Sequence, residues 1–566
     1  MHLRLAHVAL ASLALASASF ACAAGSAAAA APFPVTVTVD AAHSLGPVHP
    51  IWRFFGADEP NYTYMKDGRR LLAELGNLAP GETFFRTHNL LTTGDGTPAP
   101  KWGSTNAYTE AADGSPVYDW TITDRIFDTL LERHVRPYVE IGFMPKALST
   151  HPEPYQHEWR AGLNNELFTG WAYPPRDYAK WGGLVYQWAK HCVEKYGAAE
   201  VERWWWETWN EANIPYWKGT PEEFLQLHDY AIAAVRRALP TARVGGPDFA
   251  GHGGPLLRQF IDHCLDGTNF ATGEKGTPID FISFHAKGSP AYFKDHVRMG
   301  IAHQLRTIDE GCAIIGSYPS LKSTPIVIGE SDPEGCAACQ GGFYTYRSGT
   351  VYSSYTAASF ARESDIAARH GVNLHAALTW GFEFEDQPYF AGQRVLSTNG
   401  LALPVLNVFR MFSRLAPGRI AADSSGQVPL EAILKDGVRQ DPDVGAFASR
   451  DAHRVTVLLW HYHDDDLPGP DADVAFTLTG LPANVTSAQL THYRVDGDHS
   501  NAYAVWKKLG SPIAPNQKQY DEMQAASALA SLTDAPVTIP VSAGRATLRF
   551  PLPRQAVSLL VLDLGQ

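Results

Sequence analysis

The sequence predicts a (β/α)8 barrel of the TIM-barrel class joined to an accessory β-sandwich domain. Between residues 51 and 417, eight short apolar segments alternate with segments of helical period, as in a barrel of parallel strands. No glycine-rich phosphate turn follows the first of these segments, which argues against the alternative of a doubly wound sheet. Beyond residue 418, alternating strands are punctuated by Pro and Gly, which is typical of a β-sandwich.

The barrel elements follow one another in a regular order. One helix shows its start clearly, because Thr220 stands at the N-cap, Pro221 in the first turn and Glu223 three residues after the cap. The expected helices cover 67–75, 124–134, 177–196, 220–239, 352–370 and 404–415. The expected strands cover 53–57, 84–88, 136–143, a tryptophan-rich segment within 203–213, then 243–247, 280–285, 324–330 and 375–380.

The N-terminus has the pattern of an export signal. Residues 1–31 run from a basic start through an apolar Ala/Leu stretch to small residues, as in a secretory signal peptide. We therefore expect an exported protein, periplasmic or extracellular. No later segment reaches the length of a membrane-spanning helix.

The sandwich is expected over residues 418–566, with a helical excursion near 503–532 whose helix covers 521–532. Residues 32–50 contain a further alternating strand that has no helix partner. We expect this N-terminal strand to join the sandwich.

The amino-acid composition of the chain indicates which classes of partner it can bind. A formal net charge of -13 argues against nucleic acid, because phosphate binding needs a basic surface. Aromatic residues make up 11% of the chain and include 15 Trp, which suits a carbohydrate binder. In an exported chain the close pair Cys336 and Cys339 predicts a disulfide rather than a metal site. We expect neither a metal nor a cofactor.

Polar residues stand where the predicted barrel strands end, and the active site of such a barrel lies at the C-terminal strand ends. Glu211 follows the tryptophan-rich strand, and Glu330 follows four apolar residues and a glycine. A buried carboxylate is costly unless it is hydrogen-bonded or functional. The two acids therefore form the pair that glycoside hydrolysis needs. The other strand-end residues are Arg86, His88, Asn210, His285 and Trp380.

These motifs resemble glycoside hydrolase family 39, which holds β-xylosidases and α-L-iduronidases. The resemblance runs from about residue 50 to 525, and its pieces are 56–63, 85–91, 209–211, 284–288, 328–330, 379–386 and 506–524. It implies that Glu211 is the acid/base and Glu330 the nucleophile of a retaining mechanism. It also implies that Asn210 binds the sugar 2-OH.

The resemblance assigns further contacts to the substrate. It places His88 and His285 beside the nucleophile and the sugar, and Trp380 beneath the sugar as its floor. Glu385 and Asp386 fall where the family has acids for the distal hydroxyls, and Glu59 is a candidate at the rim. Each also has a structural interpretation, since strand-end histidines often serve as hydrogen-bonding residues, tryptophans pack in cores and loop acids are solvated.

Lys287 bears on the choice of substrate. The run from His285 to Gly288 resembles the iduronidase pattern, in which the lysine meets a uronic carboxylate. A lysine beside Glu330 could instead tune that carboxylate or belong to a structural ion pair.

The leading hypothesis is an exported retaining exo-glycosidase that removes terminal β-D-xylosyl units from xylo-oligosaccharides or aryl glycosides. Cleavage of an α-L-iduronide, an arabinoside or a galactoside stays open, as does glycosyl transfer through the same intermediate. From other classes, a non-catalytic carbohydrate-binding barrel would be favoured by loss of either acid, and both are present. A dinucleotide-dependent oxidoreductase lacks its phosphate turn.

Overall fold

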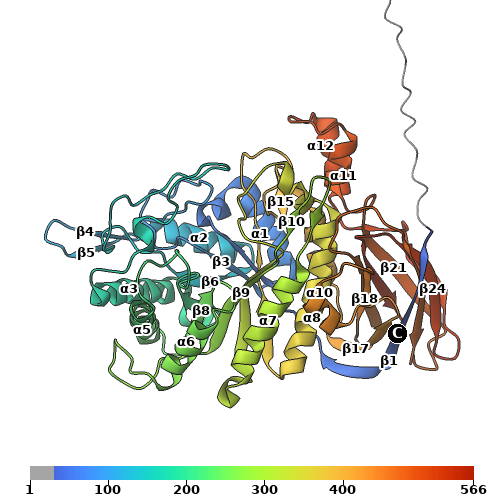
Figure 1. Ribbon diagram of the computed structural model, residues 1–566, viewed down its shortest axis with the longest axis horizontal. Coiled ribbons are helices and arrows are strands. Elements are labelled where there is room, and N and C mark those ends of the chain that lie inside the picture. The colour runs from blue at the N-terminus through green and yellow to red at the C-terminus, as the bar shows by residue number, and fades with distance from the viewer. Residues whose placement is uncertain (1–30, 566) are drawn as a thin grey trace, which may run out of the picture.

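The computed structural model describes residues 31–565, in which a barrel and a β-sandwich lie side by side (Figure 1). The predicted signal, residues 1–31, falls outside the described residues except for its last position.

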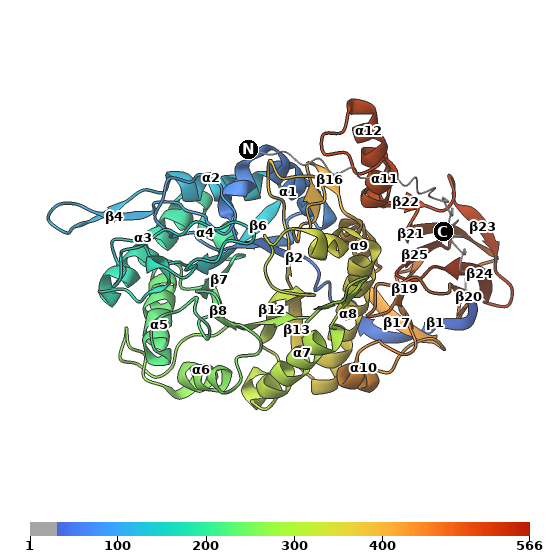
Figure 2. The same cartoon turned by 45° about the horizontal axis from the view of Figure 1, so that its top comes forward.

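Eight parallel strands form a closed barrel, which confirms the predicted fold class (Figure 2). Closure depends on the eighth strand, which is broken into two pieces. Its first piece, β13 (Asn373–Ala377), pairs with β12, and its second, β14 (Thr379–Trp380), pairs with β2. The remaining strands, in their order around the barrel, are β2 (Phe54–Ala57), β3 (Thr83–Thr87), β6 (Val135–Ile141), β7 (Trp205–Thr208), β8 (Arg243–Phe249), β9 (Phe281–Lys287) and β12 (Pro325–Asp332).

Helices surround the barrel and include two that the sequence analysis did not place, α6 (Pro255–Asp266) and α7 (Ile301–Gly316). The predicted capping box at the start of α5 is present, because Thr220 accepts from the Glu223 backbone and Glu223 accepts from the Thr220 backbone. The other barrel helices are α1 (Lys66–Leu78), α2 (Thr121–Glu132), α3 (Tyr178–Tyr196), α5 (Pro221–Ala238), α8 (Thr350–His370) and α9 (Pro404–Phe412).

The tryptophan-rich strand supplies packing to both sides of the barrel wall. Trp204 and Trp206 belong to the large core between the strands and the helices. Trp205 faces the barrel interior, where it packs with Tyr138 and Phe281. Alternate strand side chains point to opposite faces, so these rings form core, and the chemistry of β7 lies at its end.

The sandwich is built on a mixed sheet that includes the N-terminal strand. β1 (Phe33–Pro47) pairs antiparallel with β17 (Gly418–Ser424) and parallel with β20 (Ala472–Thr479). Alternate valines of β1 are buried in the sandwich core. The other strands are β18 (Asp443–Arg450), β19 (Arg454–Tyr462), β21 (Ser487–Val495), β22 (Ala530–Ser531), β23 (Val537–Pro540), β24 (Ala546–Leu552) and β25 (Val557–Asp563).

The helical excursion differs from the single helix expected at 521–532. It contains two helices, α11 (Ala502–Lys508) and α12 (Gln517–Ala526). α12 begins earlier than predicted because Asn516 and Gln519 form a capping box at its start. The chain then leaves the helix to pair as β22 with β21.

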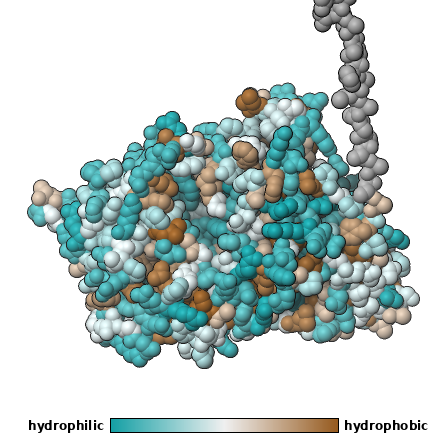
Figure 3. All heavy atoms as spheres, in the orientation of Figure 1, coloured by the Kyte–Doolittle hydropathy of each residue, from teal (hydrophilic) through white to brown (hydrophobic). Residues whose placement is uncertain are grey.

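Cys336 and Cys339 form a disulfide, as predicted, in the loop after β12. Within residues 31–565 no helix combines the length and apolar character needed to cross a membrane. On the face that Figure 3 shows, hydrophobic residues lie in separate groups among hydrophilic ones.

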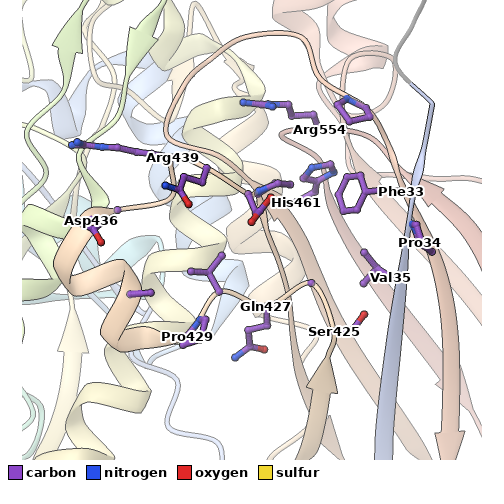
Figure 4. A pocket seen from close by; sticks show the side chains of 18 residues that line it. Phe33, Pro34, Val35, Ser425, Gln427, Pro429, Asp436, Arg439, His461 and Arg554 are labelled. Atoms are coloured by element: carbon purple, nitrogen blue, oxygen red, sulfur yellow. The ribbon is translucent and has the colours of Figure 1, made fainter.

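A cavity of about 990 Å³ lies at the sandwich, and its wall includes Phe33, Gln427 and His461 (Figure 4). None of its lining residues belongs to a barrel strand, so this space is separate from the strand ends.

Candidate active site

The predicted acid Glu211 is placed by a sharp turn after β7. Trp209 and Glu211 both have positive φ, 71° and 47°, a conformation that costs energy in residues other than glycine. The Glu211 backbone N–H donates to the Asp248 carbonyl at 3.0 Å, and the Trp209 indole donates to the Tyr216 carbonyl at 2.9 Å. These bonds hold the strained turn, so the Glu211 carboxyl has a defined position at the barrel mouth.

His285 brings the two predicted catalytic acids together. Its Nδ1 lies 2.8 Å from Glu211 Oε1 and 3.8 Å from Glu330 Oε1. These two oxygens are therefore separated by at most about 6.6 Å, the sum of those distances. Retaining glycosidases hold their carboxyl groups roughly 5–5.5 Å apart, and inverting ones about 6.5–9.5 Å. The bound on this pair of oxygens is compatible with the retaining spacing.

Glu330 is a buried carboxylate surrounded by cations. Burial alone would raise its pKa, but Lys287, then His285, His88 and Arg394, together hold the pKa well below its usual range. Lys287 is nearest, with its Nζ 2.5 Å from Glu330 Oε2 and 2.6 Å from Asp332 Oδ2. Glu330 is thus ionised at neutral pH, as a nucleophile must be.

His285 carries a positive charge. Burial lowers its pKa, but the charge of Asp248, that of Glu330 and hydrogen bonds to Asp248 and Glu211 outweigh burial and raise the pKa to about 10. Its Nε2 lies 2.7 Å from Asp248 Oδ2. Both ring nitrogens can therefore donate at once, one to Asp248 and one to Glu211.

Beneath the site, the buried Arg86 ties several strand ends together. Its guanidinium donates to Glu207 from Nε, and its Nη2 pairs with Asp248 and lies 2.9 Å from Glu140 Oε2. Arg86 Nη2 also donates to the Asn210 side-chain carbonyl at 3.1 Å. This bond fixes the amide orientation of Asn210, so that its NH₂ group is the part free to donate to a hydroxyl.

His88 and Trp380 form one wall of the site. His88 Nδ1 lies 2.5 Å from Glu140 Oε2, its Nε2 lies 3.8 Å from Glu330 Oε1, and its ring is 4.4 Å from the Trp380 ring. Trp380 donates its indole N–H to Asp58 at 2.8 Å.

Trp380 does not present the open floor that the resemblance implies. Its side chain is only 1% exposed. A Cβ at Gly56 would come within 2.5 Å of its ring, so the indole lies flat against that glycine and fills the space beneath it. Trp380 acts as a buried support that positions Asp58 and His88.

The other three predicted acids differ in their surroundings. Both carboxylate oxygens of Glu385 accept from the Asp67 backbone N–H at 3.0 Å, so Glu385 caps the start of α1. Asp386 is exposed in the same loop. Glu59 is buried rather than at the rim and accepts from the backbone of Lys101.

Sequence reasoning missed several charged residues of the site, including Asp332 at the end of β12. Asp58 follows β2 and Asp248 lies in the last part of β8, so the strand-end rule could have found both. Lys101, which pairs with Asp58, and Arg394, which lies 3.6 Å from Asp332 Oδ2, come from long loops that carry no periodic signal.

A (β/α)8 barrel with an ionised, buried glutamate on the seventh strand and a second glutamate within reach on the fourth defines a glycoside hydrolase. Comparison with known proteins agrees. The profile of the glycosyl hydrolases family 39 matches residues 35–545. The chain belongs to this family.

Similar proteins include β-xylosidases and α-L-iduronidases. The chain is 25% identical over 431 residues to a β-xylosidase of Geobacillus stearothermophilus, covering 73% of this chain and 74% of that protein. It is 28% identical over 554 residues to the human α-L-iduronidase, covering 91% and 76%. A solved monomeric β-xylosidase from Caulobacter crescentus CB15 superposes with a TM-score of 0.73 at 19% identity, over 94% of this chain and 100% of that one.

Replacing Lys287 with Met should change the pH dependence of the reaction. Lys287 is the cation that contributes most to lowering the pKa of Glu330, so its loss raises that pKa. Glu330 must be ionised to attack, and the acidic limb of the kcat/KM profile should therefore move to higher pH. The matched control is Lys275→Met, an exposed lysine paired with Asp266. An acidic limb that stays in place in Lys287→Met would contradict this account of Glu330.

Replacing Glu385 with Ala should lower stability without weakening substrate binding. The variant loses a helix cap, which contributes about 1 kcal/mol to the free energy of unfolding. Denaturant unfolding measures this loss, and Asp386→Ala in the same loop is the control expected to show little change. A rise in KM for Glu385→Ala at unchanged stability would instead place Glu385 against the substrate.

Proposed function

We propose that this chain is an exported retaining exo-glycosidase that removes terminal β-D-xylosyl units by double displacement. The observation that carries the proposal is the placement of Glu211 and Glu330 on one imidazolium, His285. The export part rests on the sequence of residues 1–31 alone.

In the first step, a carboxylate oxygen of Glu330 attacks the anomeric carbon and the glycosidic bond breaks. Glu211 gives its proton to the leaving oxygen, while His285 donates to Glu211 Oε1 and leaves Oε2 to carry that proton. In the second step, Glu211 takes a proton from water, which attacks the anomeric carbon and releases Glu330. The Asn210 NH₂ group would donate to the sugar 2-OH, a contact that strengthens as positive charge develops on the sugar.

The charge balance supports a neutral sugar. Among the described residues each cation of the site already has a carboxylate within ion-pair distance. Lys287 and Arg394 share Glu330 and Asp332, Lys101 pairs with Asp58, and Arg86 pairs with Asp248. A pentose has no carboxylate, so its binding would leave these ion pairs intact.

A second candidate is an α-L-iduronide, and a specific observation favours it. Lys287 and Arg394 lie on the same side of Glu330, at 2.5 Å and 4.0 Å from its Oε2. A uronic carboxylate could be recognised there if it displaced part of the contact with Asp332. The similarity to the human iduronidase also covers more of this chain than that to the Geobacillus xylosidase.

The roles of the two acids can be separated by mutation. Glu330→Ala should lower kcat on any glycoside by at least about 10³-fold, because it removes the nucleophile. Glu211→Ala should keep slow turnover of aryl glycosides with good leaving groups, and added azide should raise its rate, because azide attacks the anomeric carbon of the glycosyl-enzyme without a general base, releases Glu330 and gives a glycosyl azide. Circular dichroism checks that both variants fold. Activity close to wild type in Glu330→Ala, or no effect of azide on Glu211→Ala, would refute the respective role.

The sugar can be identified with matched aryl substrates. We expect kcat/KM to be highest for an aryl β-D-xyloside, measured beside the aryl α-L-iduronide, α-L-arabinoside and β-D-galactoside at one pH. A higher value for the iduronide would transfer the proposal to the second candidate. No turnover of any of the four would refute the substrate assignment.

A further inference from the structure

A second large space lies beside the active site. It is a cleft of about 830 Å³ between loops of the barrel and the helical excursion of the sandwich. Its barrel side is formed by the hairpin of β10 (Ala291–Tyr292) and β11 (Val297–Arg298) and by the 3-10 helix η4 (Gly342–Ser348). The hairpin follows β9 and η4 follows β12, the strands that carry His285 and Glu330. The cleft therefore shares the barrel face on which the active site lies.

Exposed aromatic rings line this cleft. Tyr292, Phe293 and Phe343 are 40%, 44% and 72% exposed, and the Tyr292 and Phe343 rings pack edge to face at 6.0 Å. Large aromatic rings gathered on adjacent surface loops mark an interaction site. The flat faces of such rings match the C–H faces of sugar rings.

Some polar side chains of the cleft are available to bind a ligand. Within the described part of the chain, Lys294 and Lys507 have no carboxylate at ion-pair distance, although Lys507 Nζ lies 4.4 Å from the Tyr503 ring centroid. The Asp466 carboxyl also lines the cleft. Donors and acceptors beside aromatic rings are what a hydroxylated ligand requires.

Side-chain contacts link the wall of the cleft to Glu330. The Tyr292 hydroxyl donates to Glu334 Oε2 at 3.0 Å, and Arg347 Nε donates to Glu334 Oε1 at 2.5 Å. Arg394 donates to the Glu334 carbonyl, and its Nη2 lies 4.0 Å from Glu330 Oε2. Two residues thus connect the aromatic surface with the nucleophile.

We propose that this cleft binds the leaving-group sugars of an oligosaccharide substrate. The inference rests on the proposed function, because an exo-enzyme encloses the terminal sugar and every further sugar then lies on the leaving-group side. Phe343 and Tyr292 supply the stacking surface, and Lys294, Lys507 and Asp466 meet the hydroxyls. The enzyme should accordingly favour longer chains, with kcat/KM rising from a disaccharide to a tetrasaccharide.

The test compares two substrates that share the terminal sugar. For each enzyme, kcat/KM is measured on xylotetraose and on an aryl β-xyloside, and the ratio of the two is the readout. Phe343→Ala should lower this ratio about five- to tenfold, and Lys507→Ala should lower it by a smaller factor in the same direction. Phe343 is largely exposed, so its loss does not endanger the fold.

Phe270→Ala is the control, since Phe270 is 41% exposed, stacks on His263 and lies outside the cleft. Its ratio should equal that of the wild type. An unchanged ratio in both cleft variants, or a wild-type kcat/KM that does not rise with chain length, would overturn the cleft proposal.

If another aryl glycoside proves to be the substrate, its own tetrasaccharide replaces xylotetraose. The two proposals can thus fail separately. The aryl substrates show which sugar is cleaved, and the ratio of tetrasaccharide to aryl glycoside shows whether the cleft binds the leaving-group sugars.

Discussion

The site depends on one buried cation, the guanidinium of Arg86. A charge in the barrel interior is tolerated only when partners compensate it, and Arg86 has Glu140, Glu207 and Asp248 around it. Its Nη1 has no hydrogen-bond partner among the described residues and lies 3.9 Å from Glu330 Oε1. The cation therefore holds three strand ends in register and directs its remaining charge at Glu330. Removing it would leave several buried carboxylates unpaired, which costs far more than any exposed ion pair on this surface.

The same group of ion pairs explains how the strained backbone at the barrel mouth is held. Trp209, Glu211 and Asp248 are non-glycine residues with positive φ, and they lie at the ends of two adjacent strands. Such conformations persist only where the surroundings fix them. Here the Glu211 backbone is bonded to Asp248, and the Asp248 side chain is held by Arg86 and His285. The attraction within this cluster thus offsets the energy of the strained backbone, and Glu211 is held near Glu330 through His285.

Local pattern was enough to predict the barrel and the meeting of Glu211 and Glu330 at its mouth, because apolar strands recur and side chains at their C-terminal ends converge there. Glu211 and Glu330 follow from that rule, and Asp58 and Asp248 would have followed from its full application. The roles of the acids between Glu383 and Asp386 could not be predicted in this way. Loop residues have no periodic pattern that would distinguish an acid that caps a helix from one that binds substrate. The burial of Trp380 depends on contact with Gly56, more than 300 positions earlier, and the pairing of β1 depends on strands equally remote. Such long-range contacts leave no local signal.

In the proposed function, Asp332 is the residue with which the carboxylate of an acidic sugar would compete. Lys287 and Arg394 together carry two positive charges, and Glu330 and Asp332 carry two negative ones at 2.5–4.0 Å. Asp332 also accepts from the Trp380 backbone N–H at 3.0 Å, which keeps it in place beside Lys287. A uronate would have to compete with this fixed carboxylate for the same two cations, whereas a pentose would not. Under the proposed function this charge balance favours the neutral sugar for as long as Asp332 holds its position, and the backbone bond from Trp380 in the broken eighth strand holds it there.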